Sequence, residues 1–131
     1  MDKNGYKAYQ RNSVLTATPG ELTLLLYNGC IKLIRQGRLA MSAGNIEEKN
    51  TYLLKAQRIV QELIVTLDRK QPVSEEFLPL YEYMHRRLIE ANMKNDTAIL
   101  DEVERLTITF RDTWKQVMEK AKSTQPKRER V

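Results

Sequence analysis

The sequence offers few side chains that could carry chemistry, and their spacing limits what they can do. Glu82 and His85 stand three residues apart. On a helix they would project from the same face, like the ligands of di-iron helical bundles. Such a site needs this Glu-x-x-His element twice, but the chain contains a single histidine. The sequence therefore predicts no metal site, and we expect His85 to border a helix interface as a polar residue.

Catalytic arrangements are equally hard to find. Cys30 is the only cysteine, and it lies in an apolar run far in sequence from the only histidine, so no thiolate–imidazole pair is indicated. The paired acids at 47–48 and 75–76 stand where helices are expected to begin, and there carboxylates complement the helix dipole. Gly20 and Gly29 form no phosphate-binding motif. We therefore predict a protein that is not an enzyme and binds no cofactor.

Length and composition narrow the class of protein. The chain of 131 residues suits one domain, and 30% charged residues with only 5 Gly and 4 Pro favour helices over a β-sandwich. Much of the net charge of +5 lies near the C-terminal end. No aromatic residues interleave with these basic residues, so we predict no nucleic-acid binding and interpret 123–131 as a disordered basic tail.

The same features predict a cytoplasmic protein. A single cysteine gives no disulfide framework, which fits a reducing compartment. No apolar stretch reaches the roughly 20 residues of a membrane span, and no apolar signal core follows the first residues. We therefore expect neither membrane insertion nor Sec-type secretion.

Capping residues divide the chain into four long helices. Thr18, followed by Pro19 and Glu21, forms a capping box for a helix reaching about 43, where Gly44 permits a left-handed turn. Asn45 caps a second helix that reaches about 70. A third helix covers 74–93 and a fourth 95–122, with residue 95 or 96 as its cap. Pro79 lies too deep for a first helical turn and predicts a delayed or irregular start of the third helix.

Apolar periodicity places these helices in a bundle. Steps of three and four residues define one apolar face on each of the last three helices. These faces consist of Leu53, Ala56, Val60, Leu63 and Leu67; of Phe77, Tyr81, Met84, Leu88 and Ala91; and of Ile99, Val103, Leu106, Phe110, Val117 and Ala121. Short connections imply antiparallel neighbours. We therefore predict an all-α protein, an antiparallel up-down four-helix bundle over 18–122 with an N-terminal cap segment, 1–17, packing on it.

The first helix carries two apolar stripes instead of one. The first consists of Leu22, Leu26, Gly29, Leu33 and Ala40, and the second of Leu24, Tyr27, Ile31 and Ile34. The two are rotated from each other by more than a right angle at 100° per residue. We expect the first stripe to face the bundle centre. The second stripe then forms a surface patch that the segment 1–17, a partner, or each in turn must cover.

The ordered blocks of the sequence resemble the flagellar secretion chaperones of the FliS family. The resemblance begins in "YKAYQRNSVLTATPGELTLLLYNGCIKLI" and continues in "EKNTYLLKAQRIVQEL", "LYEYMHRRLIEAN", "NDTAILDEVE" and "RDTWKQV". It therefore covers nearly the whole chain. Thr18 stands where the family more often has serine, Asn28 where it has aspartate, and Pro79 is unusual in the third helix.

The resemblance implies a helical bundle without catalytic activity that works in the cytosol. It implies binding of the disordered C-terminal segment of flagellin, prevention of premature polymerisation and delivery of the complex to a flagellar export-gate protein. It also implies that the N-terminal segment occupies a groove when flagellin is absent. A regulator that captures another disordered protein, such as the flagellar anti-sigma factor, is the alternative.

The resemblance implies that residues in the N-terminal segment and the first two helices contact the partner or form the groove that binds it. They are Tyr9, Leu24, Tyr27, Ile31, Asn50, Leu54, Lys55 and Gln57. Tyr6 joins them because it adds apolar area to the segment that would cover a groove. For Asn50, Lys55 and Gln57 the alternative is an ordinary solvated helix face.

Overall fold

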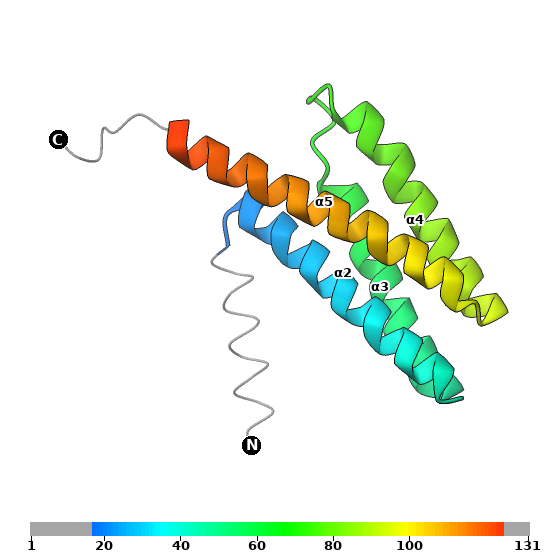
Figure 1. The fold of residues 1–131 in the computed structure, drawn as a ribbon. Coiled ribbons are helices and arrows are strands. Elements are labelled where there is room, and N and C mark those ends of the chain that lie inside the picture. The colour runs from blue at the N-terminus through cyan, green and yellow to red at the C-terminus, as the bar shows by residue number, and fades with distance from the viewer. Residues whose placement is uncertain (1–16, 125–131) are drawn as a thin grey trace, which may run out of the picture.

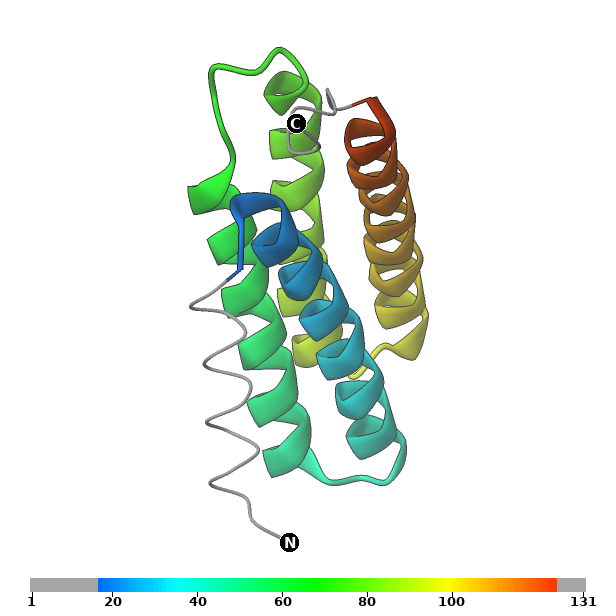
Figure 2. The same ribbon diagram turned by 90° about the vertical axis from the view of Figure 1, so that its left-hand side faces the viewer.

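Four helices form an antiparallel up-down bundle in the computed structural model, which describes residues 17–124. They are α2 (Pro19–Ser42), α3 (Ile46–Thr66), α4 (Ser74–Lys94) and α5 (Thr97–Thr124). Each helix packs on its neighbours in sequence, and α2 packs on α5 to close the ring (Figures 1 and 2). The predicted all-α four-helix bundle is confirmed. The expected packing of the N-terminal segment lies outside the described residues, as does the predicted tail from residue 125. Residues 123–124, predicted as part of that tail, belong to α5.

The predicted helix caps form as the sequence indicates. Thr18 Oγ1 accepts from the Glu21 backbone N–H at 3.2 Å, and the Thr18 N–H donates to Glu21 Oε1 at 3.2 Å. Asn45 Oδ1 accepts from the Glu48 N–H at 3.1 Å, which caps α3. Asp96 Oδ1 accepts from the N–H two residues further on at 2.9 Å. These bonds satisfy backbone donors that a helix leaves unpaired at its start.

Two boundaries differ from the prediction. The second helix, α3, ends at Thr66 instead of about 70. The third, α4, begins at Ser74 without delay, although Pro79 lies inside it, so the expectation of a delayed start is wrong. Pro79 is exposed, as is Glu75, whose carbonyl loses its intrahelical donor. Water can bond that carbonyl, and the helix therefore tolerates the proline.

A buried lysine, not foreseen from the sequence, ties α3 to the end of α4. Lys49 is only 4% exposed, and its Nζ donates to the Asn92 carbonyl at 2.9 Å and to Asn95 Oδ1 at 2.5 Å. Asn95 adopts a left-handed conformation with φ 53° and ends α4. The ammonium therefore lies where the negative end of the α4 dipole attracts a cation.

The core consists of the predicted apolar faces of α3 and α4 and of part of the α5 face. The buried members of these faces are Leu53, Ala56, Val60, Leu63, Tyr81, Met84, Leu88, Ala91, Ile99 and Val103. Leu100 on α5 is also fully buried but was not part of the predicted face. Val117 and Ala121, which were expected in the core, are exposed, and that part of the prediction is wrong. Both lie in the last turns of α5, which has 28 residues against 21 in α4; there Trp114 and Met118, and not Val117, are the residues that contact the start of α2 (Figure 1).

The two stripes of α2 take the opposite roles from those expected. Tyr27, Ile31 and Ile34 are buried, whereas four of the five first-stripe residues are only half-buried. The prediction that the second stripe forms a surface patch is therefore wrong. A bundle helix has neighbours on two sides, and both stripes are covered. One flank lies against α3, where Gly29 faces Ile59. The other lies against α5, where Arg35 pairs with Glu104 at 2.7 Å.

An aromatic cluster joins α2, α4 and α5. The hydroxyls of Tyr27 and Tyr81 are 2.5 Å apart, and both rings pack on Phe110, with centroids 5.8 Å and 5.1 Å from its centroid. Burial raises the pKa of Tyr27, and the hydrogen bond with Tyr81 adds to the shift. Burial also raises the pKa of Tyr81. The neutral phenols are therefore favoured in the folded protein.

The close approach of α2 and α3 predicts that Gly37→Ala destabilises the bundle. A β-carbon on Gly37 would lie 2.5 Å from Leu53 Cδ2 and 2.9 Å from its Cγ, and Leu53 is fully buried. We expect the free energy of unfolding to fall by about 1–3 kcal/mol. Gly20→Ala is the matched control on the same helix, because its β-carbon would meet Met118 at an ordinary 3.5 Å. The control should hold or raise stability. Urea unfolding of both variants measures these changes in the free energy of unfolding. Equal changes in the two variants would contradict the packing argument.

The tyrosine pair predicts coupled mutational effects and a loss of stability in alkali. Tyr27→Phe or Tyr81→Phe alone leaves one hydroxyl without its partner, at a cost of about 1–3 kcal/mol, while the double variant should cost less than the sum. The unfolded phenols ionise near the ordinary pKa of 10.0, below their folded pKa values. The free energy of unfolding should therefore fall as pH rises above 10, and fall less steeply in the double variant. Strictly additive single effects would show that the two hydroxyls do not interact.

Candidate partner-binding site

A cavity of about 310 Å³ lies at the end of the bundle where α2 begins and α3 ends. Most of its walls are apolar or aromatic. The lining residues are Pro19, Gly20, Thr23, Tyr27, Leu63, Thr66, Leu67, Asp68, Gln71, Val73, Phe77, Tyr81 and Trp114. Because α2 begins beside this cavity, the chain that precedes it joins the bundle there. A cavity of this size and character accommodates apolar side chains of another segment.

The long α5 and the early end of α3 together form the walls of this cavity. Trp114, on the part of α5 that faces the start of α2, donates its indole N–H to the Gly20 carbonyl at 2.9 Å. Met118 and the Trp114 indole lie close to Gly20, at ordinary contact distances of 3.5 Å and 3.7 Å from where its β-carbon would be. On the other side, α3 ends at Thr66 and the connection 67–73 follows the rim.

The tyrosine pair gives the cavity a polar group among its apolar walls. Two phenol hydroxyls carry two protons, and one proton lies in the bond between Tyr27 and Tyr81. The second proton is therefore available to an acceptor. An occupant that combines an apolar side chain with a nearby carbonyl would satisfy both features of the cavity.

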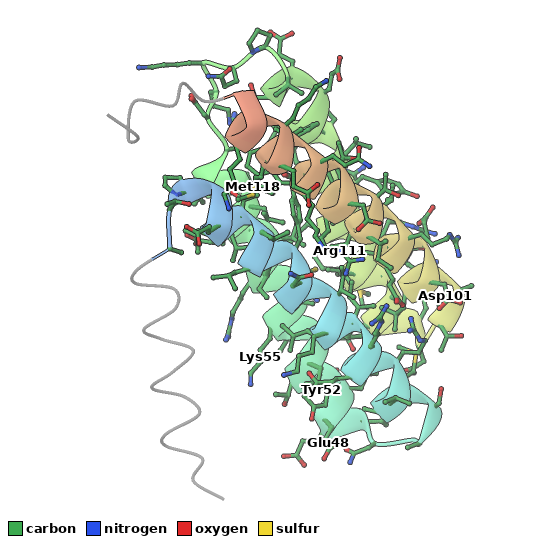
Figure 3. All side chains as sticks on the ribbon, turned by 60° about the vertical axis from the view of Figure 1, so that its left-hand side comes forward. Glu48, Tyr52, Lys55, Asp101, Arg111 and Met118 are labelled. Atoms are coloured by element: carbon green, nitrogen blue, oxygen red, sulfur yellow. The ribbon has the colours of Figure 1, made fainter. Side chains whose placement is uncertain are left out.

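The structure separates the predicted α3 residues onto two flanks. Asn50 and Gln57 lie seven residues apart on one side of the helix, with the exposed Leu54 next to them. Lys55 lies on the other side with Tyr52 and borders a shallow depression that they share with residues 45, 47, 48 and 51. In Figure 3 the labelled side chains of 48, 52 and 55 follow this side of α3. Lys55 is therefore not part of the surface formed by the other three residues.

The predicted residues of α2 are less accessible than those of α3. Leu24 is half-buried. Tyr27 is 1% exposed but lines the cavity, and Ile31 is 3% exposed in contact with the interior. Tyr6 and Tyr9 lie outside the described residues. Partner contact by these residues stays a prediction. The sequence analysis missed the cavity itself.

No reactive group emerges from the described part of the chain. Burial raises the pKa of the Cys30 thiol to about 12, so it stays protonated and unreactive at neutral pH. Within residues 17–124, no three histidine, cysteine or acidic side chains gather closely enough to hold a metal ion. None of the four described helices has the length and apolar character needed to cross a membrane.

Comparison with known proteins identifies the family. A family model described as Flagellar protein FliS matches residues 2–121. The flagellar secretion chaperone FliS of Bacillus subtilis is 54% identical over 117 residues, which cover 89% of this chain and 88% of that protein. That of Salmonella typhimurium is 33% identical over 125 residues, with coverages of 90% and 93%. Pseudomonas aeruginosa FliSB is 38% identical over 114 residues, with coverages of 82% and 90%. The chain therefore belongs to the FliS family of flagellar secretion chaperones.

Proposed function

We propose that this protein is a cytosolic export chaperone for flagellin. It binds the disordered C-terminal segment of flagellin, prevents premature polymerisation and aids delivery to the flagellar export gate. The observation that carries this proposal is the family match over residues 2–121. The bundle is non-catalytic in this role, requires no cofactor, and acts only by binding and releasing its partner.

The physical basis of the proposed binding is coupled folding. A disordered segment that becomes ordered on the bundle buries about 1,000–3,000 Å² and loses several kcal/mol of the gross interaction energy to ordering. Affinity therefore stays modest for the area covered, which suits a partner that must later be released. Two apolar surfaces are available for these contacts. One is the exposed Leu54 on α3, and the other is the aromatic cavity between the start of α2 and the end of α3.

The proposed contact residues fall into two groups on this structure. Asn50, Leu54 and Gln57 provide one surface on α3, with Lys55 on its other flank. The cavity provides the second, with Tyr27 in its wall and Leu24 and Ile31 on the same helix. We assign Tyr6 and Tyr9 to the segment that competes with the partner for the cavity.

Capture of flagellin tests the function directly. We expect the purified protein to retain full-length flagellin in a pull-down and to lose it when the C-terminal segment of flagellin is removed. The flagellar anti-sigma factor, measured in the same assay, tests the alternative partner. Equal capture of full-length and truncated flagellin would contradict the assignment of the C-terminal segment. Capture of the anti-sigma factor alone would favour the alternative.

The N-terminal segment predicts a second measurable effect. Tethering gives it an effective concentration in about the millimolar range at a cavity that begins beside residue 19. Deleting residues 1–12 should leave a folded bundle whose amide hydrogens exchange faster around the cavity. The truncated protein should also self-associate more strongly, as measured by light scattering. Flagellin affinity should rise or hold if the segment only competes, and fall if Tyr9 also contacts flagellin. Unchanged exchange and monomer content would show that the segment does not cover the cavity.

A further inference from the structure

A second pocket lies at the opposite end of the bundle from the aromatic cavity, where α2 and α4 end and α3 and α5 begin (Figure 1). It has a volume of about 270 Å³ and lies between the α2–α3 connection and the end of α4. The lining residues are Met41, Gly44, Asn45, Ile46, Lys49 and Asn95. The pocket shares no residue with the aromatic cavity or with the surface formed by Asn50, Leu54 and Gln57.

Lys49 brings a buried positive charge to this pocket without a carboxylate to balance it. Its Nζ bonds two neutral oxygens, the Asn92 carbonyl and Asn95 Oδ1. No ion pair formed within residues 17–124 includes Lys49. An ammonium has three N–H donors, so one of them has no acceptor among these residues. The end of the α4 dipole supplies only a partial negative charge, and a buried cation is costly without fuller compensation.

The two asparagines of the pocket leave their donor groups free. Asn45 Oδ1 accepts from the Glu48 N–H at 3.1 Å, and Asn95 Oδ1 accepts from Lys49 Nζ. The oxygen of each side chain is therefore engaged, whereas its NH₂ group has no partner in the described part of the chain. Both asparagines are exposed, so a ligand that enters the pocket can reach these amide donors.

No carboxylate of the described residues lines the pocket. The acids in the first turn of α3, Glu47 and Glu48, line the depression on another side of that helix instead. The Asp96 carboxylate caps α5 by accepting from the N–H two residues further on at 2.9 Å. The pocket therefore combines an ammonium and two amide donors with the apolar side chains of Met41 and Ile46, and it contains no negative side chain.

We propose that this pocket binds a carboxylate that carries a short apolar group. The carboxylate accepts from the Lys49 ammonium and from the amide groups of Asn45 and Asn95, and the apolar group contacts Met41 and Ile46. A charged acceptor bonds an ammonium more strongly than a neutral acceptor does. A carboxylate fits better than a phosphate or a sulfate, because part of the wall is apolar and favours a ligand with an apolar portion.

Two sources present this chemistry: a free aliphatic acid, and the C-terminal carboxylate of a protein whose last side chain is apolar. The pocket lies away from the surfaces assigned to flagellin, so this inference does not rest on the proposed function.

A titration followed by amide chemical shifts tests the pocket in the full-length protein at neutral pH and low salt. Valerate should shift the signals of residues 44–49 and 92–98 saturably, with a Kd in about the millimolar range, because so small a ligand makes few contacts. Valeramide has the same shape without the charge and should bind about tenfold more weakly or less tightly still. No shift with valerate, equal shifts with valeramide, or equal shifts with chloride would each overturn the proposal.

N-acetyl-leucine distinguishes the two sources, because it carries the carboxylate, the apolar side chain and the preceding carbonyl of a protein C-terminus. If it binds more tightly than valerate, the pocket takes a protein C-terminus. If valerate binds more tightly, the pocket takes a free acid. Either result supports the carboxylate site, and absence of binding by both ligands overturns it.

Asn95→Asp is the sharpest variant, because it supplies the missing carboxylate from within the chain. Aspartate still accepts from Lys49 Nζ and tolerates the left-handed conformation of residue 95. The variant should hold or raise the melting temperature and weaken valerate binding about tenfold or more. Asn28→Asp is the matched control: it adds the same charge at an exposed asparagine on α2, whose oxygen accepts from Arg111 at 3.4 Å. It should leave valerate binding unchanged.

Lys49→Met tests the ammonium itself, because it keeps an apolar stem of similar length. It should remove the preference for valerate over valeramide and lower the melting temperature, since the Asn92 carbonyl loses its donor. If this variant does not fold, Asn95→Asp still decides, because it keeps the bond from Lys49. Unchanged valerate affinity in Asn95→Asp, or in a folded Lys49→Met variant, overturns the proposal. Equal weakening by Asn28→Asp would show only a long-range effect of charge and would overturn it as well.

Discussion

The close packing of α2 on α3 is the constraint on which the rest of the bundle depends. Gly37 and Gly29 bring the α2 backbone against Leu53 and Ile59, which leaves no room for a side chain on Gly37. This contact sets the register of the first helix pair. It directs Tyr27, Cys30 and Ile34 into the core and turns the second flank of α2 towards α5. At the far end α3 stops at Thr66, and the space beside the aromatic cluster becomes a cavity.

Polar groups inside the bundle include hydrogen-bonded pairs that join helices and two atoms without a partner. Lys49 bonds the end of α4, and Tyr27 bonds Tyr81. These pairs fix how the helices meet. His85 Nε2 and Asn92 Oδ1 have no such partner.

The site chemistry is that of a binding protein. The only cysteine is buried with a raised pKa, and the cavity walls are aromatic and aliphatic with one available phenol proton. Apolar contact and a few hydrogen bonds to the main chain or side chains of a partner are the interactions that such surfaces offer. This agrees with membership of a secretion-chaperone family.

The sequence by itself determined the local structure. Thr18 with Glu21, Asn45 and Asp96 specify where helices begin, because their side chains bond backbone donors only a few residues away. Apolar residues at steps of three and four identified the core faces of α3 and α4, because the helix repeat places residues at that spacing on one side. Ordered blocks along the whole chain identified the family, since family likeness needs no knowledge of contacts.

Only the tertiary structure decided which of the two α2 stripes faces the core. Both stripes are apolar, and the choice depends on where α3 and α5 lie, which no local pattern records. The same holds for Val117, which periodicity places in the core but which is exposed, while Trp114 and Met118 beside it contact the start of α2. The cavity and the contact between α3 and the end of α4 join residues far apart in the chain, such as Gly20 with Trp114 and Lys49 with Asn92. Such sites arise from the register between helices, and that register is fixed by side-chain packing across the whole bundle.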